Sequence, residues 1–157
     1  MLTIIKNILN IILFFLIIFT ASCNNKEKLF LYISENNVTA LQKALSDDVN
    51  VNVARENGFT LLMFAVFHGK IKIVNLLLQA GADVNQIDNN GFSALMYAAK
   101  SYSKNRNVII KILLKMKASI DLINKKGESA FMIALKNNKV STALLLLKHN
   151  ANPKGYM

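Results

Sequence analysis

The stretch "GFTLLMFA", from Gly58 to Ala65, is repeated with few changes as "GFSALMYA" from Gly91 and as "GESAFMIA" from Gly127. The first interval is 33 residues and the second is 36. Internal periods of this length are typical of stacked structural units, each of which buries its apolar face only against its neighbours. The repetition therefore predicts one continuous core with a long regular surface beside it.

Each copy of the stretch predicts a turn followed by a short helix. The glycine supplies the permissive backbone of the turn, and two residues later Thr60, Ser93 or Ser129 is placed to cap a helix by accepting a backbone N–H hydrogen bond. The first helices are expected at Leu61–Phe67, Ala94–Lys100 and Ala130–Lys136.

A second helix is expected in each unit, because apolar residues recur there at helical spacing. They are Ile71, Val74, Leu77 and Leu78; Ile110, Leu113 and Leu114; and Val140, Ala143, Leu146 and Leu147. Gly81 is suited to end one of these helices in the left-handed conformation, with Lys117 and Asn150 at the equivalent positions. A weaker unit, "KLFLYISENNVTALQKALSDDVNVNV", precedes these and lacks the opening glycine.

The best unit, "NGFTLLMFAVFHGKIKIVNLLLQAGADVNQID" from Asn57 to Asp88, resembles an ankyrin repeat, and the resemblance extends over 25–153. It implies an all-α ankyrin-repeat solenoid of about four helix-turn-helix repeats, approximately 25–54, 55–87, 88–123 and 124–153. The "T-P-L-H" phrase of the family reads "TLLM", "SALM" and "SAFM" here, so methionines replace the histidine that ties neighbouring turns together. A looser array than a consensus one is expected.

The N-terminal residues predict export. Lys6 is the single charge from Met1 to Phe19, and "IILFFLIIF" is followed by "TASC". The end of this segment resembles a bacterial lipobox, which implies a lipoprotein signal peptide over 1–22, an acylated Cys23, and an ankyrin-repeat domain over 23–157. The expected location is then a bacterial membrane, on its exported side (periplasmic or cell surface). Plain cleavage, an uncleaved anchor and an incidental cysteine are the alternatives.

The chain carries a formal net charge of +10, and this excess lies between Lys100 and the C-terminus. The stretch from Cys23 to Ala99 is nearly balanced. A basic half could bind anionic lipid or a polyanion, or it could reflect a general preference for lysine at the surface.

No residue pattern predicts catalysis. His68 and His149 are far apart, and Cys23 is the only cysteine. Asp47 and Asp48 are adjacent at a helix end, phosphate-binding glycine loops are lacking, and aromatic and basic residues do not alternate as on a single-strand nucleic-acid platform. We expect no enzyme activity, no cofactor, no metal and no nucleic-acid partner.

The resemblance implies a protein partner bound on the concave face. Carried over by position, the contact residues are Glu56, Asn57, Phe59, Phe67, His68, Asn89, Asn90, Phe92, Lys100, Ser101, Lys125, Lys126, Glu128, Lys136 and Asn137. Phe59 and Phe92 could instead pack between adjacent turns, and an inhibitor or immunity role against a secreted enzyme is an alternative form of the same binding.

Two further features bear on contacts. The insertion "KSYSKNRN", Lys100 to Asn107, is either a contact loop or a tolerated surface loop. At the C-terminal edge Leu144 replaces the polar residues of the other units, which predicts self-association there.

Overall fold

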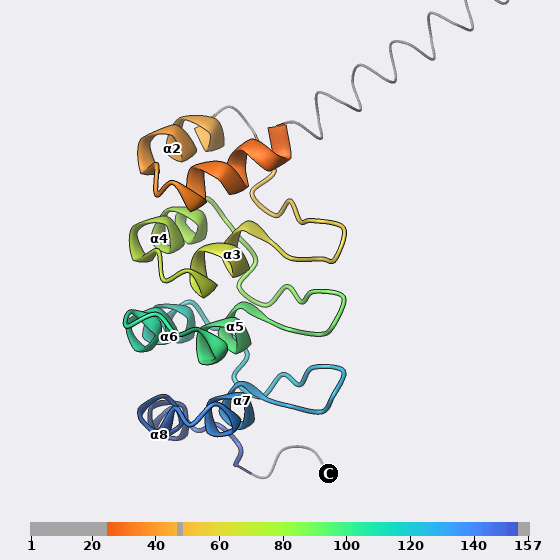
Figure 1. Ribbon diagram of the computed structural model, residues 1–157, viewed down its shortest axis with the longest axis vertical. Coiled ribbons are helices and arrows are strands. Elements are labelled where there is room, and N and C mark those ends of the chain that lie inside the picture. The colour runs from red at the N-terminus through yellow and green to blue at the C-terminus, as the bar shows by residue number, and fades with distance from the viewer. Residues whose placement is uncertain (1–24, 47–48, 154–157) are drawn as a thin grey trace, which may run out of the picture.

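Helices joined in antiparallel pairs make up the part of the chain that the computed structural model describes, residues 25–46 and 49–153 (Figure 1). Residues 25–34 are helical and are followed by α2 (Val38–Ser46), α3 (Leu61–Phe67), α4 (Ile71–Gln79), α5 (Ala94–Lys100), α6 (Arg106–Lys115), α7 (Ala130–Lys136) and α8 (Val140–Lys148). Within these residues, extended structure is limited to isolated bridges. The all-α prediction is confirmed, and the first helices have the predicted bounds.

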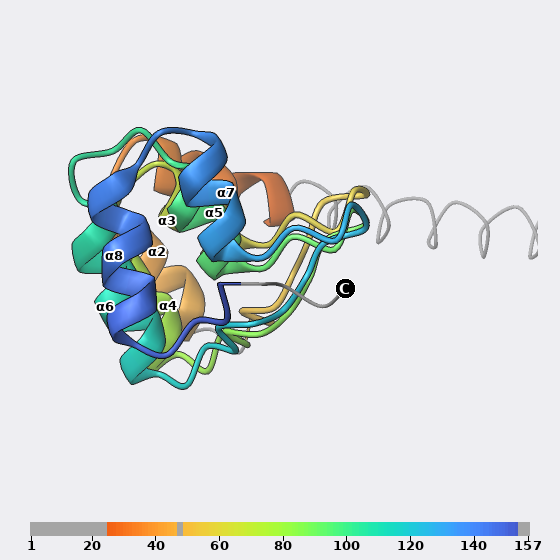
Figure 2. The ribbon, with the colours of Figure 1, turned by 90° about the horizontal axis from the view of Figure 1, so that it is seen from below.

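The pairs stack along one axis, so that α3, α5 and α7 form an inner row while α2, α4, α6 and α8 form an outer row (Figures 1 and 2). A hairpin-like loop, here called a finger, projects from the start of each inner helix. Its base is closed by a bridge between Ala54 and Thr60, Ile87 and Ser93, or Ile123 and Ser129. Seen along the stack, the helices and fingers meet at an angle, which gives the molecule one concave side (Figure 2).

The hydroxyl residue at each predicted cap performs that role. The side chains of Thr60, Ser93 and Ser129 accept hydrogen bonds from backbone amides three residues later, at 3.1, 3.4 and 3.3 Å. An N-cap of this kind stabilises a helix by about 1 kcal/mol. The inner helices are only seven residues long, too short to persist alone, so their caps and packing hold them together.

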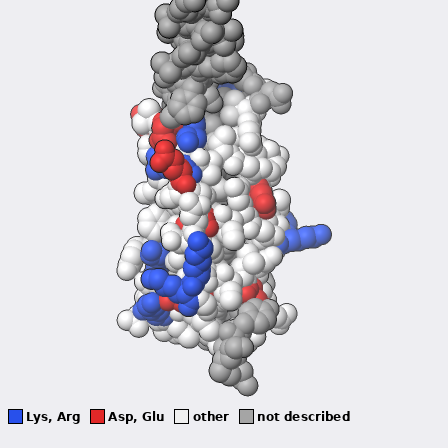
Figure 3. Space-filling view, turned by 90° about the vertical axis from the view of Figure 1, so that its right-hand side faces the viewer, with Lys and Arg blue, Asp and Glu red and all other residues white. Residues whose placement is uncertain are grey.

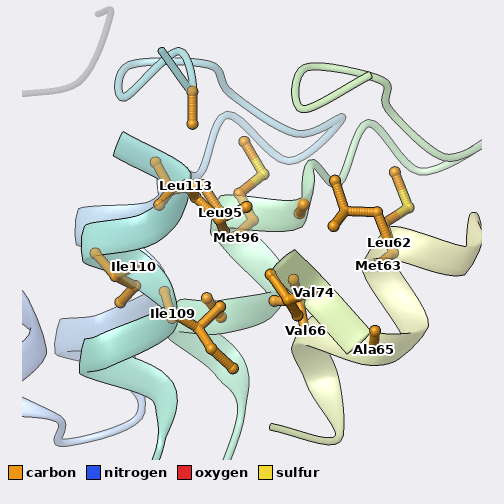
Figure 4. Packing of buried hydrophobic residues seen from close by; sticks show 14 of the residues in the cluster. Leu62, Met63, Ala65, Val66, Val74, Leu95, Met96, Ile109, Ile110 and Leu113 are labelled. Atoms are coloured by element: carbon orange, nitrogen blue, oxygen red, sulfur yellow. The ribbon is translucent and has the colours of Figure 1, made fainter. Parts of the chain in front are cut away.

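The core lies between successive pairs (Figure 4). Ala65, Ala98 and Ala134 are fully buried where inner helices stack, and their small side chains allow the helices to approach closely. Larger apolar residues of the outer helices, such as Leu77 and Leu113, are also fully buried. Truncating a buried leucine costs about 2–5 kcal/mol, so these positions dominate the stability of the stack.

Two expectations about turn chemistry can now be compared with the structure. Gly81, Lys117 and Asn150 all have positive φ angles, of 87°, 63° and 66°, as predicted. Neighbouring fingers are connected despite the missing histidines, because Asn89 N–H donates to the Asn57 carbonyl at 2.9 Å and Lys125 N–H to the Asn90 carbonyl at 3.0 Å.

One of the methionines that replace those histidines makes a polar contact of its own. Met63 is buried, and its sulfur accepts a weak hydrogen bond from Thr60 N–H at 3.5 Å. This contact completes a reciprocal cap at the start of α3. The thioether thus takes over one polar contact in addition to filling space.

The predicted signal segment and Cys23 lie outside the described residues, as do Asp47 and Asp48. Among the helices that the structure does describe, none combines the length and the apolar character needed to cross a membrane.

Candidate functional site

The inner helices and the fingers bring most of the predicted contact residues to the concave side. Those with exposed side chains are Glu56, Asn57, His68, Asn89, Asn90, Lys100, Lys125, Lys126 and Lys136. Phe59, Phe67, Phe92, Glu128 and Asn137 are half-buried. The surface therefore combines polar side chains at its rim with partly covered aromatic rings.

Ser101 does not belong to this surface, and its prediction as a contact residue is wrong. Its side chain is fully buried, and its hydroxyl donates to the Phe67 carbonyl at 2.6 Å. The backbone at Ser101 is extended, with φ −60° and ψ 140°, whereas His68 at the equivalent position has φ −83° and ψ 0°. The inserted loop starts here and turns the side chain inward.

Six aromatic rings form a connected set, the aromatic cluster, which consists of Phe30, Phe59, Phe64, Phe67, Phe92 and Tyr97. Tyr97 is its centre: its ring centroid lies 4.8 Å from that of Phe59, 5.3 Å from that of Phe92 and 6.0 Å from that of Phe67. Phe64 continues the cluster to Phe30 at 5.5 Å. Tyr97 of inner helix α5 thus partly covers Phe59 and Phe92. The two phenylalanines are neither open contact residues nor fully packed between adjacent turns.

Tyr97 is fixed by a buried carboxylate. Its hydroxyl donates to Asp88 Oδ2 at 2.7 Å, while Asp88 Oδ1 accepts from the amides of Asn90 and Phe92 at 2.9 and 2.8 Å. Asp88 is only 4% exposed. Burial, followed by the hydrogen bond to Asp88 and its negative charge, raises the pKa of Tyr97 well above its usual range. The ring is therefore a neutral hydrogen-bond donor at physiological pH.

Arg55 departs from the pattern of the other fingers. At the equivalent places, Asp88 and Asn124 accept hydrogen bonds from the amides of their own turns. Arg55 cannot do so. Its guanidinium carbon lies 4.2 Å from the ring centroid of Phe30, and the group pairs with Glu27 at 3.0 Å. Asn57 supplies the missing turn contact by accepting from the amide of Phe59 at 3.1 Å.

The displaced arginine borders an open groove of about 400 Å³ at the N-terminal end of the concave side. Phe30, Leu31 and Phe64 provide its apolar lining, while Glu27, Lys28, Ser34 and Arg55 provide polar groups. Arginine and aromatic residues together are characteristic of energetically important positions in protein interfaces.

Sequence reasoning missed these residues. Phe30, Phe64, Tyr97 and Arg55 are not among the predicted contacts, although two signals in the sequence point to three of them. Phe64 and Tyr97 occupy equivalent positions in their units, and Arg55 stands where the other units have aspartate or asparagine.

Toward the C-terminal units the same side becomes basic (Figure 3). We define the lysine surface as Lys100, Lys125, Lys126 and Lys136, all exposed. Lys100 Nζ lies 5.5 Å from the ring centroid of Phe92, and Lys136 Nζ pairs with Glu128 Oε1 at 2.7 Å. The hydrogen bonds from Lys136 and Asn124 lower the pKa of Glu128, so Glu128 is charged at neutral pH.

The inserted loop between α5 and α6 is anchored on both sides. Asn105 Nδ2 donates to the Gly69 carbonyl of the preceding unit at 2.9 Å. Lys139, from the following unit, is 7% exposed and donates through Nζ to the carbonyls of Lys100 and Ser101, the latter at 2.7 Å. Tyr102, 81% exposed, remains the outward-facing part of the loop.

The histidines show no metal-binding arrangement. His68 stacks edge-on against Phe64 and Phe67, with ring centroids 4.5 and 5.5 Å away, and burial together with the Lys70 charge lowers its pKa. Over the described ranges, histidine, cysteine and carboxylate side chains nowhere gather in a group of three or more that could hold an ion.

Comparison with known proteins agrees with this architecture. The family model "Ankyrin repeats (3 copies)" matches residues 1–105 and 81–156. An ankyrin repeat protein of Acanthamoeba polyphaga mimivirus is 40% identical over 75 residues, which is 46% of this chain and 12% of that protein. An ankyrin repeat protein of Fowlpox virus is 41% identical over 58 residues, 37% of this chain and 8% of that protein. The chain thus spans about a tenth of the length of these relatives. The repeated fold and the family match together place this chain in the ankyrin-repeat family.

Proposed function

We propose that this chain binds another protein through the concave side formed by its fingers and inner helices, while an acylated Cys23 holds it at a membrane. Ankyrin repeats generally serve as protein–protein interaction modules and typically act as scaffolds without catalytic activity. The observation that carries the proposal is the position of Arg55. Its side chain does not stabilise its own turn, as those of Asp88 and Asn124 do. It stacks on Phe30 beside an open groove instead.

The aromatic cluster supports the same function. Phe30 is buried, and the other five rings are half-buried in the free chain. A partner could cover the remaining ring surface at little entropic cost, because the rings already hold one another in place. The groups that are fully buried beside them, such as Asp88, are saturated with internal hydrogen bonds. The surface is therefore suited to contact more than to proton transfer.

The test of binding is capture by the purified full chain, with each captured protein identified by mass spectrometry. Arg55→Asn introduces the residue type found at the equivalent position of another finger, so it should leave the fold intact. It should lower the amount of a genuine partner at least about ten-fold, since interface arginines are frequent hot spots. Lys111→Asn, which removes an exposed positive charge from outer helix α6, is the matched control and should change nothing. A partner captured equally by both variants would disprove binding through this side.

The membrane part of the proposal is supported by sequence alone. Cys23 follows an apolar run and small residues, as in a lipobox, and several acyl chains on one cysteine suffice for stable membrane attachment. The expected location is the exported side of a bacterial membrane. Expression in a bacterial host with labelled fatty acid tests this: the native chain should be labelled and Cys23→Ser should not. Membrane association without labelling would favour an uncleaved anchor.

A further inference from the structure

We infer that the partner presents an acidic extended segment to the lysine surface, with acidic residues that reach both the inner helices and the finger of the last two units. This inference rests on the proposed function and specifies the chemistry of the partner. It depends on where Lys100, Lys125, Lys126 and Lys136 lie and on how few acidic groups accompany them.

The lysines are the result of a change in residue type along the stack. At the last position of the inner helices, Phe67 is followed by Lys100 and Lys136. At the tip of the fingers, Glu56 is followed by Asn89 and Lys125, and Asn57 by Asn90 and Lys126. The concave side therefore carries charges of both signs at its N-terminal end and becomes basic over the last two units (Figure 3).

Little negative charge offsets these lysines. Among the described residues, Glu128 is the acidic residue that pairs with one of them, Lys136. Asp88 lies nearby, but it is 4% exposed and its oxygens already accept from Tyr97, Asn90 and Phe92. Glu128 also lies close enough to Lys126 for the two charges to interact. An approaching partner therefore meets two lysine charges, those of Lys100 and Lys125, for which the described residues provide no carboxylate partner.

The arrangement also sets the spacing of the partner's charges. Lys100 and Lys136 lie at the C-terminal ends of seven-residue helices, whereas Lys125 and Lys126 belong to a finger that precedes the N-terminal end of α7. Seven helical residues span about 10 Å, which an extended segment covers in about three residues. The finger projects beyond the start of α7 (Figure 2), so acidic residues must be separated by more than three positions to reach both groups of lysines.

A protein segment fits this surface better than a nucleic acid does. Single-strand binders offer open aromatic faces on which bases stack, whereas Phe59, Phe92 and Tyr97 face one another at 4.8 and 5.3 Å. A flat bilayer fits less well too. Lys100 and Lys136 end inner helices, whereas Lys125 and Lys126 lie in a finger, and the helices and fingers meet at an angle (Figure 2).

The experiment uses a fluorescein-labelled peptide, Gly-Ser-Glu-Glu-Ala-Tyr-Ala-Glu-Glu-Ser-Gly, whose binding to the full chain is followed by anisotropy at low salt. The test variant replaces the four residues of the lysine surface with glutamine. The control variant makes the same replacements at four exposed lysines on or next to the outer helices: Lys111, Lys115, Lys117 and Lys148. Both variants lose the same charge, so only the position of that charge differs.

We expect the test variant to bind the peptide at least about ten-fold more weakly than the native chain, because each exposed ion pair contributes up to a few-fold in affinity. The control variant should change affinity by less than about two-fold, and the same peptide with lysine in place of glutamate should not bind. Equal losses in the two variants, or no binding by the native chain, would overturn the inference. Tighter binding of a twelve-residue oligothymidylate or of vesicles containing phosphatidylserine, lost in the same test variant, would overturn it in favour of nucleic acid or lipid.

The proposed function is tested separately from this inference. If a protein whose capture depends on Arg55 is still retained by the test variant, the inference of an acidic segment is wrong, whereas the proposed protein binding is still supported. If capture does not depend on Arg55, the proposed function itself is wrong.

Discussion

Lys139→Met should destabilise the array by about 2 kcal/mol. Lys139 precedes α8, and its ammonium group reaches into the preceding unit, where it donates to the carbonyls of Lys100 and Ser101 at the end of α5. Methionine keeps a side chain of similar length and apolar character but removes the donors. The substitution therefore tests the capping role with little change in packing.

The magnitude follows from two opposing contributions. A hydrogen bond from a charged donor contributes about 1.5–3 kcal/mol net, and two such bonds are lost. Against this, burial of the ammonium and the nearby charge of Arg106 are unfavourable, as the lowered pKa of Lys139 indicates. The balance of these contributions gives the expected loss of about 2 kcal/mol, which for a chain of this size lowers Tm by about 4–8 °C.

Urea unfolding followed by far-UV circular dichroism measures this loss, and amide hydrogen exchange locates it. Lys70→Met is the matched control, because Lys70 occupies the same position before α4 with a similar backbone conformation. It should change the free energy of unfolding by less than about 0.5 kcal/mol. Faster exchange should be confined to the end of α5 and the following loop. Equal losses in the two variants, or unchanged exchange at the end of α5, would refute the capping role.

Three further variants test other parts of the structure. Tyr97→Phe should cost about 1–2 kcal/mol by thermal unfolding, because it leaves Asp88 without its hydroxyl donor, and an unchanged Tm would contradict the role of that hydrogen bond. Glu128 has a lowered pKa in the folded chain, so the stability that its charge contributes is complete above pH 4.5, the usual pKa of a glutamate, and is lost as pH falls below that value. The free energy of unfolding of Glu128→Gln should therefore approach that of the native chain in acid. A difference that stays constant down to pH 3 would contradict this. Val140 and Leu144 form an apolar edge and are 62% and 60% exposed. We expect analytical ultracentrifugation to show concentration-dependent association of the native chain, and replacement of both residues by lysine to abolish it. A native chain that stays monomeric would exclude this edge as a contact.

The parts of the fold that depend on local sequence were predictable. A glycine, a hydroxyl residue and an apolar run determine where each inner helix begins, because the turn and the cap involve residues within three positions of one another. Thr60, Ser93 and Ser129 therefore act as predicted, and so does the left-handed backbone at Gly81 and Lys117.

The contacts between units were less accessible from the sequence. The sequence predicts Ser101 at the surface because it aligns with His68, but the inserted loop changes the backbone at that point and buries the side chain. Arg55 contacts Phe30 and Glu27 of the preceding unit, and a pattern read along one unit does not contain these partners. Tyr97 bonds Asp88 within its own unit, but its ring also packs on Phe59 and Phe67 of the preceding one. Comparing equivalent positions between units would have revealed the exchange of aspartate or asparagine for arginine.

The doubly anchored loop after α5 has a consequence for how this array can evolve. Ordinary repeats can be duplicated, deleted or permuted, since each joint resembles the next. Here the loop that holds Asn105 packs against Gly69 on one side, where a Cβ atom at position 69 would lie 1.9 Å from Ser103 Oγ, and the end of α5 requires Lys139 on the other. Recombination that gave the third unit different neighbours would break both connections, so we expect this unit and the two beside it to be inherited as one block.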